Sequence, residues 1–543
     1  MPSATETPAR AAFRLPFGLC LTCVVLAGLA VALATGGSKA LFIDEYFSVL
    51  ESVGQAPLLY AGELDREFSS REIWASNDFA GVYRSVMAGD NGNMSAFAFL
   101  SHIMTKALGA SRPLVLQIVP IAAFLASIVW SYRLGRLLFS RPVGLLAALL
   151  CMANFTLIQF ATEVRAYGLG IALCLIATEC FVRIVGLDRQ GNEAEPPAPR
   201  FWCVLYAGAT LAALFTHFLS VMIIAGHVAY AVLAVRDRRT WVRLAVSGAF
   251  VAAVFLPVHR LFLSSENYSV VDDYFAYLQS QGKKSRKSFT PKHVATAVGG
   301  SAFQLSGMPA LAGTMVAAVL PVGAFGLAVV FPGMRRGIAG AARPLLLLGI
   351  LAFVCLSVSL VTLALGFALF PVNRRYQVFS IPYFAVGMAW LLRQAWESPG
   401  PRWAERSRRA FAAAYVGVLL LSPVLLVRQA MTAGKPESYE IVARDLAAKA
   451  AAGSVAKVVV PTVLDFQMLA FRMGPGADVR FEVEDRELTL SLTRKLEAMK
   501  LSHPIALFDE LRYAYEDNGE AFAELQPESD IGGVVRIGYG KKP

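Results

Sequence analysis

The chain has 543 residues, of which 56% are hydrophobic and only 16% charged, and its formal net charge is +11. With a mean hydropathy of +0.54, this composition excludes an ordinary soluble enzyme and predicts a polytopic α-helical membrane protein. All seven cysteines lie inside apolar runs, so no disulfide framework is expected.

Apolar runs of about 20 residues, the length needed to cross a bilayer, recur along the chain. We expect about eleven of them, at 17–35, 113–137, 142–160, 167–187, 201–220, 221–235, 242–262, 307–331, 344–370, 377–392 and 410–428. The first run is interpreted as an uncleaved membrane helix and not as a signal peptide, because it has the length of a span and further spans follow.

Arginine clusters occupy every second connection between these runs, for example Arg133/Arg136/Arg141 and Arg236/Arg238/Arg239. Positive residues accumulate on the cytoplasmic side of membrane proteins. The N-terminus is therefore predicted to be cytoplasmic, and the loops 36–112 and 263–306 and the tail after 428 are predicted to be external.

Two adjacent acids, Asp44 and Glu45, follow the first run in the stretch LFIDEYFSVL. Carboxylates where a helix leaves a membrane are costly unless they are used. Neighbours on a helix point about 100° apart, so only one of the two acids can face a given reacting atom. The alternative is a solvated helix start, where acidic residues are favoured by the helix dipole.

The first external loop and the tail have different characters. The loop, 36–112, mixes acids and aromatic residues and predicts one or two helices along the membrane surface, including an amphipathic stretch at 93–109. The tail, 429–543, has the composition of a water-soluble domain. Helices at 437–451 and 488–500 and strands at 455–460, 504–508 and 534–539 predict a small α/β domain there.

Two spans that begin on the external side carry arginine at their start, with Arg165 before Tyr167 and Arg374 and Arg375 before Tyr376. A helix N-terminus with an arginine fork favours a phosphate group. The alternative is an interfacial arginine that reaches for water beside a belt tyrosine.

Two further residues lie near these starts. Glu163 can pair with Arg165 only if this segment is not helical, because positions two apart on a helix face nearly opposite sides. His217 is at the external end of the fifth run, either as a binding residue or as a hydrogen-bonded interfacial histidine, and no second histidine stands at metal-ligand spacing. His227 is assigned to packing. The sequence has no P-loop, no dinucleotide fingerprint and no HExxH motif.

These pieces, in this order, resemble the membrane-embedded GT-C glycosyltransferases, in particular the branch with the lipid A aminoarabinose and protein mannosyltransferases. The resemblance covers residues 17 to about 395 and, more weakly, the tail. The motifs that carry it are Asp44-Glu45-Tyr46, Arg133-Leu134-Gly135-Arg136, Glu163-Val164-Arg165-Ala166-Tyr167, Thr216-His217-Phe218 and Arg375-Tyr376. One turn departs from the family, which often has His-Pro-Pro where this chain has Asn91-Gly92-Asn93.

The resemblance implies transfer of a hexose or pentose from a polyprenyl-phosphate donor to a lipid, glycan or protein acceptor, at the external face of a bacterial inner membrane. Asp44 matches the family's acidic catalytic position, with Glu45 beside it. Glu163, Arg165, His217 and Arg375 match positions that line the cavity. No cofactor is required, although a divalent metal is an alternative partner for the phosphate, and no nucleic acid is involved.

Two other functions remain open from the sequence. A lipid-linked sugar flippase or transporter would be expected to show charges deep within its spans and inverted repeats, whereas the charges here gather at span ends and no repeat is visible. A membrane scaffold without catalytic activity, whose tail binds a partner, fits the same sequence.

Overall fold

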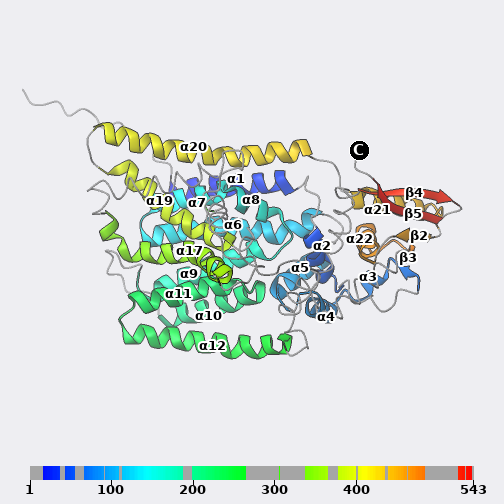
Figure 1. Ribbon diagram of the computed structural model, residues 1–543, viewed down its shortest axis with the longest axis horizontal. Helices are drawn as coiled ribbons and strands as arrows, with labels where there is room; N and C mark the ends of the chain where they lie inside the picture. The colour runs from blue at the N-terminus through cyan, green and yellow to red at the C-terminus, as the bar shows by residue number, and fades with distance from the viewer. Residues whose placement is uncertain are drawn as a thin grey trace, which may run out of the picture.

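A computed structural model gives the fold of the chain (Figure 1). It describes residues 16–36, 43–55, 66–90, 92–108, 113–187, 199–263, 305, 337–364, 377–398, 402–433, 438–455, 457–460, 463–483, 524–531 and 534–540. Long helices form a bundle, and the short helices α2–α5 gather at one end of it together with a small sheet and the helices α21 and α22 (Figure 1). The loop 36–112 and the tail therefore meet at the same end of the bundle.

The bundle helices follow the apolar runs of the sequence closely. They are α1 (Phe17–Gly36), α6 (Pro113–Leu138), α7 (Arg141–Ala153), α8 (Phe155–Thr162), α9 (Tyr167–Ile184), α10 (Pro199–Thr216), α11 (Ser220–Ala234), α12 (Arg238–Leu263), α17 (Ala342–Ala364), η4 (Val378–Ser380), α19 (Ile381–Glu397) and α20 (Arg402–Ala433).

The described helices are those of a multi-pass membrane protein. Among them, five are long and apolar enough to cross a membrane, and the bent pair α7 and α8 can form a sixth span. The helices α10, α11 and α17 contain shorter apolar segments. The run 307–331 lies outside the described residues, so the count of about eleven spans stays a prediction.

The run predicted at 142–160 is not one continuous helix. It breaks at Asn154, which has an extended backbone, and α7 and α8 meet there at an angle of 61°. The Asn154 side chain accepts a hydrogen bond from Leu157 N at 3.0 Å and so caps α8. Capping satisfies a backbone N–H that a helix start leaves without an intrahelical partner.

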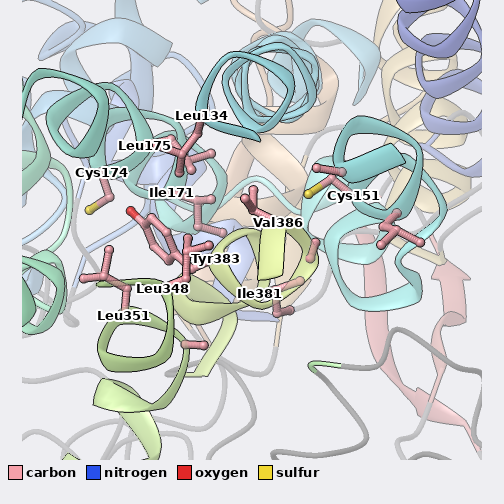
Figure 2. Packing of buried hydrophobic residues seen from close by; sticks show 14 of the residues in the cluster. Leu134, Cys151, Ile171, Cys174, Leu175, Leu348, Leu351, Ile381, Tyr383 and Val386 are labelled. Carbon is pink, nitrogen blue, oxygen red and sulfur yellow. The ribbon is translucent and has the colours of Figure 1, made fainter. Parts of the chain in front are cut away.

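The interior of the bundle is apolar, and its helices approach closely. Leu348 and Leu351 of α17, Ile171 and Leu175 of α9, and Ile381 of α19 belong to one buried cluster (Figure 2). All seven cysteines are free, as predicted. At the end far from α2, Glu179 of α9 pairs with Arg133 of α6 at 2.7 Å and with Arg183 at 3.0 Å.

The short elements at the α2 end come from two distant parts of the chain. The first loop contributes α2 (Ile43–Ser52), β1 (Phe68–Ser69), α3 (Glu72–Ala75), α4 (Phe79–Asp90) and α5 (Ser95–Leu108). The tail contributes α21 (Ser438–Ala451), β2 (Lys457–Val460), α22 (Val463–Met473), β3 (Arg480–Val483), β4 (Glu524–Ile531) and β5 (Val534–Gly540). The helix at 437–451 and the strands at 455–460 and 534–539 correspond to α21, β2 and β5, while 488–500 and 504–508 lie outside the described residues.

One mixed sheet joins the two parts, with the strand order β1-β3-β2-β5-β4. The central strand β2 runs parallel to β3 and β5, and β1 from the first loop pairs antiparallel with β3. Ser70, directly after β1, donates through its hydroxyl to Ala477 O at 2.9 Å and accepts from Val479 N at 3.0 Å. The sheet is therefore not made by residues 429–543 alone, and the division at 428 stays a prediction.

The glycine that follows α2 gives a test of how tightly these parts fit. Gly54 has a φ of +81°, and a Cβ added there would collide with Ser76 O, whereas Gly474, with a φ of +82°, has open space around it. We expect Gly474→Ala to lower the free energy of unfolding by about 1 kcal/mol through the left-handed backbone alone. Gly54→Ala adds a backbone collision to the same strain, so it should lower the thermal midpoint of the purified protein much further. Equal shifts would mean that Gly54 and Ser76 do not approach each other.

Candidate functional site

The short helix α2 is enclosed on every side. Each residue from Glu45 to Gln55 is buried. Its apolar side chains, such as Tyr46 and Leu50, share one cluster with Phe97 of α5 and Phe466 of α22. A helix of this length is not stable by itself in water. Its conformation therefore depends on the bundle, the first loop and the tail that pack around it.

One face of α2 is polar although it is buried. Glu45, Ser48 and Ser52 recur at spacings of three or four residues, and none is more than 1% exposed. Buried polar groups are costly unless they form hydrogen bonds. The backbone at the end of α2 bonds to the neighbouring helices as well. The carbonyl oxygen of Ser52 contacts His102 Nδ1 of α5 at 2.9 Å, and the carbonyl oxygen of Gln55, just after α2, accepts a hydrogen bond from the Ser85 hydroxyl of α4.

Glu45 is bonded to the segment that precedes α9. Its Oε1 accepts a hydrogen bond from Val164 N at 2.7 Å, a charge-assisted contact that is stronger than one between neutral groups. The segment is not helical, since Glu163 has an extended backbone and Arg165 N donates to Glu163 O at 2.8 Å. This is the non-helical conformation that any pairing of Glu163 with Arg165 requires.

This contact changes the interpretation of the two acids. The sequence placed Glu45 with Asp44 in the catalytic pair, with one acid expected to face a cleft and the other water or a basic partner. Glu45 accepts a hydrogen bond from a buried backbone N–H, so it also holds the chain before α9, and the catalytic assignment of the two acids stays a prediction. Asp44 lies at the start of α2, and its side chain is outside what the structure describes.

Arg165 approaches the same face of α2. Its Nη1 donates to the Ser48 hydroxyl at 3.2 Å, and its guanidinium carbon lies 6.0 Å from the ring centre of Tyr167. Ser48 is one turn after Glu45, so the carboxylate and the guanidinium meet α2 at neighbouring positions. Arg165 is half-buried and bonded to α2. This placement differs from that of an interfacial arginine that extends into water, which was the alternative interpretation of the sequence.

His217 lies beside Tyr167. Their ring centres are 4.8 Å apart, and the ring of Phe379 in η4 is 5.7 Å from that of His217. His217 Nδ1 accepts a hydrogen bond from Leu219 N at 3.2 Å, which assigns the ring proton of a neutral imidazole to Nε2. The next residue, Phe218, donates through its backbone N–H to Asn93 Oδ1 at 3.1 Å. The turn that departs from the family pattern thus contacts the turn that carries His217.

The structure brings Glu45, Arg165, Tyr167 and His217 into one connected set, with Glu163 in the turn between them. Arg374, Arg375 and Tyr376 lie outside the described residues, so their place in the site stays a prediction. Within the part of the chain that is described, no three His, Cys, Asp or Glu side chains lie close enough together to hold a metal ion.

Sequence reasoning missed several residues of this site. Ser48 could have been found, because Glu45, Ser48 and Ser52 recur at helical spacing in this segment. Arg472 of α22 had no local signal. Its guanidinium carbon lies 5.6 Å from the ring centre of Tyr46, and its Nε donates to the Tyr46 hydroxyl at 3.4 Å across 426 positions of sequence.

No protein-family model matches the sequence, and no curated protein matches it. Solved structures do match. The crystal structure of ArnT from Cupriavidus metallidurans in the apo state is 16% identical, covers 93% of this chain and 96% of that one, and has a TM-score of 0.51. The same protein bound to undecaprenyl phosphate is 14% identical, covers 88% of each chain and has a TM-score of 0.51. At this identity the likeness shows that the chain shares the fold of these ArnT structures.

The bond between Glu45 and Val164 can be tested by amide hydrogen exchange. Glu45→Ala removes the acceptor, and losing a charge-assisted hydrogen bond of about 2 kcal/mol should speed exchange at Val164 about 30-fold. Glu45→Gln keeps a carbonyl oxygen and should have a much smaller effect. The amide of Gly170, bonded to Ala166 O at 2.9 Å, serves as an internal control. Unchanged exchange at Val164 in Glu45→Ala would show that the carboxylate does not hold this segment.

Proposed function

We propose that this chain is a membrane glycosyltransferase that moves a sugar from a polyprenyl-phosphate donor to a lipid, glycan or protein acceptor on the external face of the membrane. The observation that carries the proposal is the attachment of Arg165, next to Tyr167 and His217, to the acidic helix α2 in a chain that shares the ArnT fold over nearly its whole length. ArnT has been crystallised with undecaprenyl phosphate, which supports a polyprenyl-phosphate donor.

The proposed reaction is a displacement at the anomeric carbon of the donor sugar. An acceptor oxygen forms a bond to that carbon, the bond from carbon to phosphate oxygen breaks, and polyprenyl phosphate leaves with the electron pair. A carboxylate takes the proton of the acceptor as a general base. Arginine side chains stabilise the negative charge of the departing phosphate.

The proposal assigns the base to Asp44 and the phosphate contacts to Arg165, Arg374 and Arg375. Neighbouring residues on a helix point about 100° apart, so the commitment of Glu45 to Val164 favours Asp44 for the acceptor. Glu45 then acts indirectly, by holding the segment that carries Arg165. Glu163, Tyr167, His217 and Tyr376 complete the proposed binding surface for the donor.

The donor brings its own leaving group, so the reaction as proposed needs no nucleotide site and no cofactor. A divalent cation is the alternative partner for the phosphate. Assays with and without EDTA distinguish the arginines from a divalent cation as the groups that neutralise the phosphate. If the arginines alone neutralise it, chelation should leave the rate of transfer unchanged.

We expect Asp44→Asn to lower turnover by about 10²-fold, the scale for loss of a general base, while donor binding survives. Glu45→Gln should be milder, since its carbonyl oxygen still accepts from Val164. The measurement is release of polyprenyl phosphate from a panel of labelled undecaprenyl-phosphate sugars by purified protein. An inactive Glu45→Gln beside an active Asp44→Asn would reverse the assignment. A transporter or scaffold would release no polyprenyl phosphate in the wild type.

The external position of the site is tested by thiol labelling. All seven native cysteines are replaced, and a cysteine is placed at Gly476, which is exposed near the end of α22. It should react with a membrane-impermeant reagent in intact bacteria. The matched control is a cysteine at Arg136, which is exposed near the end of α6 and should react only after lysis. The opposite pattern would put the tail and α2 on the cytoplasmic side and contradict the proposed location.

A further inference from the structure

Four polar side chains from four different helices meet inside the bundle. They are Thr178 of α9, Tyr206 of α10, His227 of α11 and Tyr383 of α19, and we refer to them as the Thr178 hub. Thr178, His227 and Tyr383 are at most 1% exposed, and Tyr206 is also buried. Figure 2 shows the hydroxyl of Tyr383 directed towards α9, beside Cys174. Polar groups inside a membrane bundle are rare, and they are retained where they bond to one another across helices.

One arrangement of protons satisfies every contact of the hub. In it the Thr178 hydroxyl donates to Cys174 O at 2.8 Å and accepts from His227 Nε2 and from the Tyr383 hydroxyl, both at 2.9 Å. His227 then carries its proton on Nε2, and its Nδ1 accepts from the Tyr206 hydroxyl at 3.3 Å. In this arrangement hydrogen bonds join all four side chains of the hub.

The helices joined by the hub are the ones that carry part of the candidate site. Tyr167 is the first residue of α9, His217 lies between the end of α10 and the start of α11, and Phe379 is in η4 directly before α19. Ring contacts between these residues limit their distances but tolerate sliding and tilting. The hydrogen bonds of the hub are directional, so they hold the four helices in one register.

Close packing connects the relative positions of these helices to the candidate site. A Cβ added at Gly170, one turn into α9, would lie 2.9 Å from Cε1 of Phe379. The ring of Phe379 therefore packs directly on the backbone of α9 at Gly170, where no side chain would fit. A change in the placement of α19 or α11 at the hub would therefore move Phe379 and His217 relative to Tyr167.

We propose that the Thr178 hub positions the donor site, with His227 as a positioning residue that acts through His217 and Phe379. This inference rests on the proposed transferase function. A catalytic site needs its groups held in place before the substrate arrives, and small displacements produced far from the chemistry are costly. The competing explanation is that the hub only contributes stability, as any buried interhelical hydrogen bond can.

Two variants of one residue separate these explanations. His227→Phe keeps a ring that can stack on Phe181, whose ring centre is 4.5 Å from that of His227, and removes both hydrogen bonds. His227→Gln keeps one amide donor and one carbonyl acceptor. The matched control is Ser131→Ala, which removes the buried contact of 3.2 Å between Ser131 of α6 and Cys151 of α7 without changing a hub residue.

The experiment combines kinetics with hydrogen exchange. With the labelled undecaprenyl-phosphate donors, His227→Phe should lower kcat about tenfold and leave the KM for donor within about twofold, and His227→Gln should recover most of kcat. Exchange at the amide of Leu219, which is bonded to His217, should rise about threefold in His227→Phe, the scale of one interhelical bond. Ser131→Ala, which removes one interhelical contact outside the hub, should change neither kcat nor this exchange rate.

Several results would overturn the inference, and they differ from failure of the transferase. Unchanged Leu219 exchange in His227→Phe contradicts it whether or not the protein is an enzyme. A normal kcat in an active protein contradicts it as well. If the wild type releases no polyprenyl phosphate, the proposed function fails, and the exchange at Leu219 still decides whether the hub holds the His217 turn. If His227→Phe does not fold, Tyr206→Phe removes the bond to His227 Nδ1 and keeps the histidine, and it is expected to change both readouts in the same direction.

Discussion

The buried carboxylate of Glu45 is the constraint on which the α2 end of the molecule depends. A carboxylate that is 1% exposed must be bonded, and one of its partners is the backbone N–H of Val164. That N–H lies between the end of α8 and the start of α9, directly after Glu163, where the backbone is extended. The contact draws α2 onto the bundle, and it fixes the segment from which Arg165 reaches Ser48 and lies beside the ring of Tyr167.

The other side of α2 gives the tail a role in the same arrangement. Tyr46 contacts Arg472 of α22, and the apolar residues of α2, the first loop and the tail form one continuous cluster. Ion pairs also cross between the first loop and the tail, such as Lys457 with Glu67 at 3.3 Å, but exposed pairs of this kind contribute little to stability. The shared sheet and the shared core therefore carry most of the attachment. The tail is part of the scaffold that surrounds α2, and it is not an appendage to the bundle.

The sequence predicted the parts of this structure that depend on composition and missed those that depend on distant partners. Apolar runs mark the bundle helices directly, and Asp44 and Glu45 are conspicuous after the first of them. The contact of Glu45 could not be predicted, since its partner Val164 lies 119 positions away. The strand β4 contains Pro527 and charged residues, as an edge strand can, and so lacks the β-branched run that identified β2. The stretch at 142–160 was predicted as one span because one polar residue, Asn154, barely changes the hydropathy of an apolar run.

His227 is a second residue whose role depends on partners that are distant in the sequence. Seen alone in an apolar run it is a packing residue, and its partners stand 49 and 21 positions away on other helices, with Tyr383 joined to the same hydroxyl across 205 positions. Only the fold reveals that these groups satisfy one another. Hydrogen bonds then support the candidate site from two sides. The bond between Glu45 and Val164 acts from the side of α2, and the bonds of the Thr178 hub act from within the bundle. In both cases the cost of burying polar groups is met by bonds inside the protein before any substrate binds. A site arranged in this way needs little reorganisation during a reaction, which is the condition under which fixed charges and dipoles stabilise a transition state most effectively.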